Sequence, residues 1–342
     1  MPSALAILAI LSFALCLGLA VVVVALKLAR NIRESRIRRR RDALRGAIEN
    51  AGEGLSERLL VDSLRGGPER IDDALWALET ADIGDARRAV FAAMAGRGRL
   101  AKALTRIQSD RRAVIRSRAA LITGRLGGAD AIPRIVTCLD DPETARAAVR
   151  ALGMIGTPDA AGALLAALRT VGCRERVLDQ LANPWAADAV AVALAAEDDP
   201  QLRPILIEAT GLNGARSAVP DLERALASDS TEDRVRAARA LGRLGVGLDA
   251  LLVAMDDDEW AVRAQAAAAI ALIGGDHQGD EVVRALSDGL ADPAWWVRAH
   301  CANALSASPD GRDALERARH APDRFVRDRA EEAVVARYLL SS

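Results

Sequence analysis

The side chains best suited to recognise another molecule are three tryptophans and two arginines in the last third of the sequence. Trp260, Trp295 and Trp296 stand beside acidic turns, and Arg263 and Arg298 follow them closely. Aromatic residues make up only 3% of the chain, so this concentration stands out. Trp and Arg are enriched at the energetic centres of protein interfaces. We predict that these five residues bind a partner; the alternative is that the rings fill gaps between helices, because Trp is mostly buried.

Residue patterns for catalysis, or for holding a metal ion or a cofactor, are not found in the sequence. There is no P-loop, no GxSxG and no HExxH motif. The acidic run 256–259 lacks the pattern of a calcium loop, so a solvated capping turn is predicted there. No two cysteines form a CxxC pair, and we interpret all four as small buried residues in a reducing compartment. They are Cys16, Cys138, Cys173 and Cys301.

The first 28 residues are predicted to form a membrane anchor. No residue from Ala4 to Leu26 is charged, and 23 residues at about 1.5 Å each make a helix of roughly 34 Å, enough to cross a hydrocarbon core of about 30 Å. A cleaved signal peptide is the alternative, but it needs basic residues before the apolar run, and Met1, Pro2 and Ser3 supply none. We therefore expect one N-terminal transmembrane helix.

A basic segment, residues 29–48, follows the predicted span as a juxtamembrane linker. Basic residues close to a span stay on the cytoplasmic side. The expected location is thus a cell inner membrane, crossed once, with the N-terminus outside and the remaining chain in the cytoplasm. The arginines predicted to meet the membrane surface are Arg36, Arg38, Arg39, Arg40 and Arg41.

Charge also argues against a nucleic-acid partner. The whole chain has a net charge of −1, and between Lys27 and Arg45 nine basic residues face two acidic ones, a local charge of +7. The rest of the chain must carry −8, because −1 minus +7 is −8. A nucleic-acid backbone requires clustered Lys and Arg on the body that binds it.

The remaining residues, 49–342, contain an internal repeat. The phrase at 239–245, Arg-Ala-Leu-Gly-Arg-Leu-Gly, is echoed at 150–156. An arginine upstream of this phrase recurs at intervals of 29 residues or slightly more. It falls at Arg58, Arg87, Arg116, Ala145 (beside Arg146), Arg174, Arg203, Arg234, Arg263, Arg298 and Arg327. A fixed period of this length indicates a solenoid.

Each repeat is predicted to form two short helices. The first, for example 233–244, ends at glycines suited to a helix C-terminus, and an acidic turn such as Asp292-Pro293 precedes the next first helix. Each recurring arginine is expected to pair with a turn carboxylate such as Asp258 or Asp292 and so join neighbouring repeats. The predicted fold is all-α: an α-solenoid of about ten two-helix repeats after one N-terminal transmembrane helix.

The repeated phrase, with its Val-Arg start and Asp-Pro turns, resembles the short HEAT-like repeats of the phycobilisome-lyase type over roughly residues 50–337. Its Ala- and Arg-rich composition resembles that of bacterial, membrane-anchored members with a single span. Some HEAT-repeat proteins are enzymes. Deoxyhypusine hydroxylases bind iron through His-Glu pairs, but the three histidines here precede Gln278, Cys301 and Ala321. Alkylpurine glycosylases need a basic concave face, and this body is acidic.

The resemblance therefore implies a non-catalytic, membrane-anchored scaffold whose cytoplasmic solenoid binds a protein partner that is itself membrane-associated. Chains of this appearance resemble companions of membrane glycosyltransferases and of envelope polysaccharide machinery. The alternative is a bilin lyase-like or other enzyme-associated regulatory subunit that handles a cofactor protein. For the scaffold, we expect no small-molecule substrate, no nucleic-acid partner and no cofactor.

Overall fold

The computed structural model describes residues 4–50, 53–82, 99–126, 128–170, 174–273 and 279–341. Within them, all regular secondary structure is helical and none is strand, which confirms the all-α part of the predicted fold. The chain divides into two compact units, 1–135 and 136–342. The predicted repeat position Arg87 lies outside the described residues, as do Cys173 and the side chain of Cys16. Cys138 and Cys301 are buried, as predicted.

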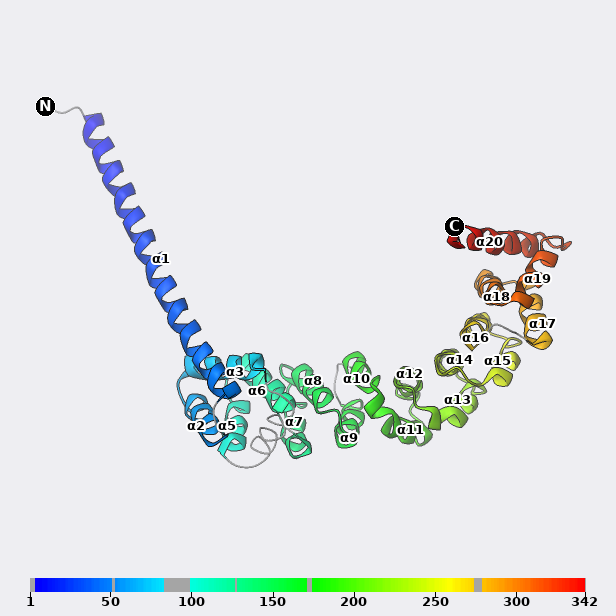
Figure 1. The fold of residues 1–342 in the computed structure, drawn as a ribbon, viewed down its shortest axis with the longest axis horizontal. Coiled ribbons are helices and arrows are strands. Elements are labelled where there is room, and N and C mark those ends of the chain that lie inside the picture. The colour runs from blue at the N-terminus through cyan, green and yellow to red at the C-terminus, as the bar shows by residue number, and fades with distance from the viewer. Residues whose placement is uncertain are drawn as a thin grey trace. The chain divides into compact units, whose positions relative to one another are not determined.

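The first unit consists of one long helix and several short ones (Figure 1). Their order is α1 (Ala4–Asn50), α2 (Glu53–Leu64), α3 (Pro68–Thr80), α5 (Arg99–Gln108), α6 (Ala113–Leu126) and η1 (Ala129–Ala131), with α7 (Ile132–Val136) at the boundary. The C-terminal end of α1 packs on α2 and α3, where Ile48 joins a core with Leu75 and Leu104. This core fixes the last turns of α1 against the short helices.

The predicted membrane location is wrong. In the described part of the chain, no helix is at once long enough and apolar enough to span a bilayer. Most of the predicted span, 4–26, falls on residues whose side chains lie outside the described set. The helix does not end at residue 28 either, because α1 continues unbroken to Asn50. The single-pass assignment, with the N-terminus outside and the solenoid cytoplasmic, is therefore withdrawn.

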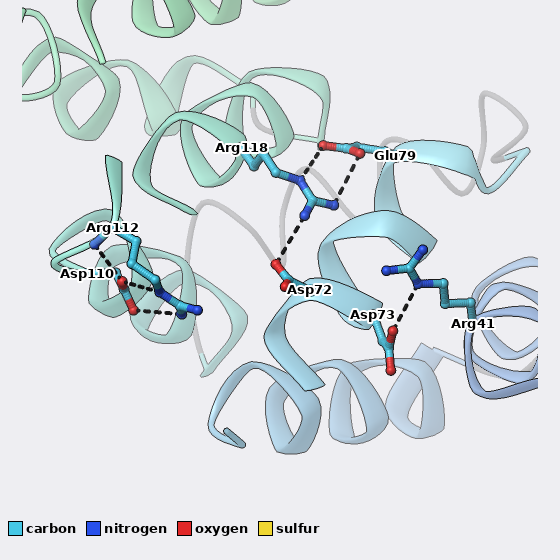
Figure 2. Close-up of polar contacts among 7 residues, drawn as sticks. All are labelled: Arg41, Asp72, Asp73, Glu79, Asp110, Arg112 and Arg118. Carbon is cyan, nitrogen blue, oxygen red and sulfur yellow. Dashed lines mark hydrogen bonds and ion pairs between the residues drawn. The ribbon is translucent and has the colours of Figure 1, made fainter. Parts of the chain in front are cut away.

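The basic segment of α1 instead meets acidic residues of α3. Arg41 donates from Nε to Oδ1 of Asp73 at 2.9 Å (Figure 2), and Nε of Arg40 lies 3.2 Å from the other oxygen of that carboxylate. The Asp73 side chain is only 4% exposed, so both ion pairs are shielded from water on one side. Arg41 and Arg45 also lie over the Trp76 ring, at 5.5 and 5.8 Å from its centre. Part of the basic segment thus holds the first unit together.

The helices of the second unit lie alternately in two rows (Figure 1). One row contains α8 (Ala145–Ile155), α10 (Arg174–Leu181), α12 (Arg203–Asn213), α14 (Thr231–Leu244), α16 (Trp260–Ile273), α18 (Trp295–Ala307) and α20 (Arg324–Ser341). The other contains α9 (Pro158–Ala167), α11 (Ala187–Ala195), α13 (Val219–Leu226), α15 (Leu248–Ala254), α17 (Asp280–Asp288) and α19 (Pro309–Ala318). The short helices η2 (Pro184–Ala186), η3 (Arg216–Ala218) and η4 (Gly289–Ala291) lie in the connections.

The repeated glycines explain how closely the helices of the first row approach. A Cβ at Gly242 would lie 2.7 Å from the Cα of Ala269, and one at Gly211 would lie 2.7 Å from the Cα of Ala240. Only glycine permits these contacts between α12, α14 and α16 without moving the backbone. The second glycine of the phrase ends the helix, as predicted: Gly245 has a φ of +67°.

Candidate partner-binding surface

The predicted tryptophans lie at the N-terminal ends of two neighbouring helices. Trp260 opens α16, and Trp295 and Trp296 open α18, while Arg263 and Arg298 follow one turn later. Trp260 and Trp295 occupy the same repeat position, three residues before the arginine. Since α16 and α18 are in contact, the repeat brings both aromatic positions to the same end of adjacent helices.

The three rings are exposed, and those of Trp295 and Trp296 are also held by contacts with other side chains. Trp260 and Trp295 are each 47% exposed, and Trp296 is 54% exposed. The rings of Trp295 and Trp296 meet edge to face with centres 4.6 Å apart. The Trp296 ring stacks on His300, and burial lowers the pKa of that histidine. Rings that merely filled gaps between helices would show far less surface.

Helix α20 adds two residues to this surface that the sequence analysis missed. The Phe325 ring is 63% exposed and lies below Arg298, whose guanidinium carbon is 5.1 Å from the ring centre. Arg329 lies over Trp295 at 4.8 Å. The repeat position could have revealed Phe325, because it precedes Arg327 by two residues as Trp296 precedes Arg298. We call Trp260, Trp295, Trp296, Phe325 and Arg298 the aromatic surface.

Arg263 joins two repeats instead of facing a partner. Its Nε and Nη2 donate to the two carboxylate oxygens of Asp292 at 2.7 and 3.1 Å, and its Nη1 donates to the backbone carbonyls of Asp257 and Asp258. Burial by itself would raise the pKa of Asp292, but hydrogen bonds from Arg263 and from the N–H of Ala294 outweigh it and hold that pKa below its usual value. The predicted pairing with Asp292 is confirmed.

The preceding repeat contains the same arrangement. Arg234 donates to Asp257 through Nε and Nη2 at 2.8 and 3.0 Å, and through Nη1 to the carbonyl of Ser228. Asp257, not the predicted Asp258, is the paired residue. It also accepts a hydrogen bond from the N–H of Glu259, the capping role expected of this acidic run. We call each such arginine–carboxylate pair a rung.

A groove of about 980 Å³ lies between α15 and α17, next to Arg263. Most of the charged side chains that line it are acidic, among them Asp249, Asp256, Glu281 and Asp288. Among the described residues, no group of three His, Cys, Asp or Glu side chains is arranged to hold a metal ion. Burial raises the pKa of the Cys301 thiol to about 12, so it stays protonated at neutral pH.

The five arginines predicted to meet a membrane surface do not act alike. Arg40 and Arg41 pair with Asp73, as described above, whereas Arg36, Arg38 and Arg39 are exposed along α1. The exposed three contribute nothing to the core of the first unit. That these three arginines meet a membrane surface stays a prediction.

Comparisons with known proteins identify the repeat. The family model for HEAT repeats matches residues 99–182 and 248–334, which is 84 + 87 = 171 of 342 residues, half of the chain. No curated protein matches.

One similar solved structure is an engineered protein, with 19% identity over 86% of this chain and 98% of that chain and a TM-score of 0.39. Another is human deoxyhypusine hydroxylase in complex with glycerol, with 20% identity over 89% of this chain and 98% of that chain and a TM-score of 0.29. A third is yeast importin-beta, Kap95p, with 14% identity over 81% of this chain and 45% of that chain and a TM-score of 0.47. At these TM-scores the likenesses support no argument about activity or partners.

Proposed function

Because this chain belongs to the HEAT-repeat family, whose solenoids typically serve protein–protein interaction, we propose that it is a non-catalytic scaffold that binds a protein partner. The partner binds the aromatic surface at the ends of α16, α18 and α20. The observation that carries this proposal is the half-exposure of Trp260, Trp295 and Trp296 in a chain with so few aromatic residues.

The magnitude of the exposed apolar area supports the choice of surface. A large aromatic side chain buries roughly 150–250 Å² when it is covered, so a half-exposed ring retains on the order of 100 Å² for a partner. At about 25 cal/mol per Å², each ring can contribute about 2–3 kcal/mol to binding. The ring contacts within the surface limit the side-chain entropy lost on binding.

Arg263 was predicted to bind the partner as well. Both of its carboxylate-facing nitrogens are engaged by Asp292, so we propose that it positions the turn that carries Trp295 and Trp296. Asp292 caps the N–H of Ala294 immediately before these rings. Arg298 remains the proposed direct contact.

Co-purification of the full chain from its native host tests the proposal. The variant Trp295→Ala/Trp296→Ala removes the ring pair, and Val192→Ala is the control because Val192 is an exposed apolar residue, 72% exposed, on α11. A specific partner should be retained by the wild type and by the control but lost from the double variant, with unchanged helical circular dichroism in all three.

Equal recovery of the partner with the double variant would contradict the assignment of the surface, and absence of any bound protein would contradict the scaffold. Sequence-based candidates for the partner are a glycosyltransferase or envelope polysaccharide machinery. Mass spectrometry of the retained protein decides among them.

A further inference from the structure

The rungs of Arg234 and Arg263 follow a rule that breaks at Arg298. In each intact rung, Nη1 of the arginine donates to the carbonyls six and five residues earlier, and Nε and Nη2 bind a carboxylate in the next turn. That carboxylate lies six residues before the following arginine: Asp257 precedes Arg263, and Asp292 precedes Arg298. Six residues before Arg327 stands Ala321.

The turn at Ala321 otherwise resembles the turn at Asp292. Both continue with proline, Pro293 in one turn and Pro322 in the other. Ala321 replaces the carboxylate, and an acid stands two residues later, at Asp323, where it accepts hydrogen bonds from the N–H groups at the start of α20. Another repeat lacks the acid at this position, because Ser228 stands there, but its arginine, Arg203, pairs instead with Asp233 at 3.1 Å. Arg298 has no carboxylate partner among the described residues.

We propose that Arg298 binds a carboxylate of a partner protein, in an acidic segment whose Asp or Glu takes the place of the acid that Ala321 lacks. This inference rests on the proposed function of the aromatic surface. It adds the chemistry of the bound segment: one carboxylate flanked by apolar or aromatic side chains.

The guanidinium of Arg298 is held in position for this role. Its Nη1 donates to the carbonyls of Asp292 and Pro293 at 2.8 and 2.9 Å, the contacts that Arg263 makes one repeat earlier. The Phe325 ring supports one face of the group. Nε and Nη2 are the two donors that bind Asp292 in the Arg263 rung, so the intact rung shows which ligand this geometry accepts. A fixed bidentate donor loses little entropy on binding.

The surroundings favour an isolated carboxylate over a polyanion. Exposed rings of Trp295, Trp296 and Phe325 flank Arg298, and covering them with apolar groups would strengthen the ion pair by excluding water. Two further arginines of α20 are paired within the helix, Arg324 with Asp328 and Arg329 with Glu332, while Arg327 donates to the backbone carbonyls of Ala321 and Pro322. A nucleic-acid backbone needs several uncompensated cations, whereas a single acidic side chain needs one.

Two carboxylates lie on the turns next to Arg298, and neither pairs with its Nε or Nη2. Asp292 lies on the turn that precedes Arg298 and interacts electrostatically with it, but its carboxylate is bound by Arg263. Asp323 of the next turn accepts hydrogen bonds from the N–H groups of Phe325 and Val326, so it caps α20. Both carboxylates already have partners, and neither pairs with Arg298.

The variant Ala321→Asp tests the geometry without any partner. It should rebuild the rung, because Asp at this position would meet Nε and Nη2 of Arg298 as Asp292 meets those of Arg263. The melting temperature of the full chain should rise by a few degrees, and the additional Arg298→Gln substitution should abolish the gain. An unchanged or lower melting temperature would show that position 321 does not face Arg298, and would overturn the inference.

Selection of binders from a displayed library of random peptides on the full chain tests the ligand. Enriched peptides should carry Asp or Glu next to aromatic or aliphatic residues. Their affinity, measured by fluorescence anisotropy, should fall at least about tenfold with Arg298→Gln, with Ala321→Asp, and with Asp→Asn in the peptide. Arg317→Gln, which removes an exposed charge on α19, is the matched control and should leave affinity unchanged.

The two proposals fail in different ways. Peptides that lose affinity with Trp296→Ala but not with Arg298→Gln or Ala321→Asp would leave the aromatic surface intact and overturn the carboxylate site. Peptides enriched without an acidic residue, an empty selection, or Arg298-dependent binding of a DNA oligonucleotide in place of peptides would also overturn it. Peptides unaffected by any of these variants would contradict both proposals.

Discussion

The two compact units join their helices with different ion pairs. In the second unit two pairs follow the repeat, Arg234 with Asp257 and Arg263 with Asp292, in the same bidentate geometry. In the first unit, Arg118 of α6 instead reaches two carboxylates of α3, Asp72 and Glu79, each at 3.2 Å (Figure 2). A repeated contact uses the same two residue types in successive repeats, so the replacement of one acid, at Ala321, leaves the preceding arginine, Arg298, without its carboxylate.

Close contact between first-row helices should be the most sensitive feature of the second unit. Gly242→Val would place side-chain atoms against the backbone of Ala269, so we expect a destabilisation of about 3 kcal/mol, at the upper end for overpacking. Chemical denaturation measures it. Gly162→Ala on α9 is the control, because nothing lies within 4 Å of the added Cβ, and it should stabilise by about 0.5 kcal/mol. Equal effects would mean that the two helices are not in contact.

Breaking a rung should destabilise the second unit more than breaking an exposed pair destabilises the first. Asp292→Ala leaves Arg263, only 15% exposed, without its carboxylate. We expect a loss of about 2 kcal/mol, less than the roughly 3–5 kcal/mol for a fully buried pair, because some water reaches both groups. Urea denaturation of the full chain checks this value, and Arg263→Ala/Asp292→Ala should recover part of the loss.

Acid should weaken the rungs selectively. The pKa values of Asp257 and Asp292 are below their usual 3.8, since hydrogen bonds from arginine and backbone N–H groups outweigh burial, which acts in the opposite direction. A depressed carboxyl pKa stabilises the folded state above the unfolded pKa, and this contribution is lost as the pH falls below about 3.8 through the folded value. Between neutral pH and this acidic range, the melting temperature of the double variant Asp257→Asn/Asp292→Asn should fall by about 2 °C less than that of the wild type. An identical fall in the variant would argue against these pairs.

The local pair of Arg112 with Asp110 in the first unit should matter least. Nε of Arg112 lies 3.0 Å from the carboxylate of a residue two positions away, and the Arg112 side chain is 42% exposed (Figure 2). Exposed pairs of this kind contribute little to stability. Arg112→Gln should leave the melting temperature unchanged within error, and a drop as large as that of Asp292→Ala would invalidate the distinction between the units.

Much of the second unit was predictable from the sequence because its contacts repeat. The spacing of 29 residues predicted the first helices, their glycine ends and the pair between Arg263 and Asp292. It did not predict the contacts of α20, because Phe325 and Arg329 reach the surface from a helix whose own repeat phrase is incomplete. The replacement of the acid by Ala321 was visible, but its meaning required the geometry of an intact rung.

The first unit and the membrane assignment were less predictable for a related reason. The apolar run and the following arginines were interpreted separately, as an anchor and a linker, whereas α1 passes through both without a break. Arg41 is committed to Asp73 and Trp76 of α3, contacts that no local pattern signals because they join residues 32 and 35 positions away. Such non-repeating pairs depend on tertiary packing alone.

Photo-crosslinking in the native host tests the central claim most directly. A photoreactive phenylalanine analogue replaces Trp296 in one strain and Val192 in another, and the crosslinked products are identified by mass spectrometry. We expect one protein to be attached at position 296 and absent at position 192, with an acidic segment at the crosslink. No crosslink at position 296, or the same products at both positions, would contradict a partner-binding surface at the ends of α16, α18 and α20.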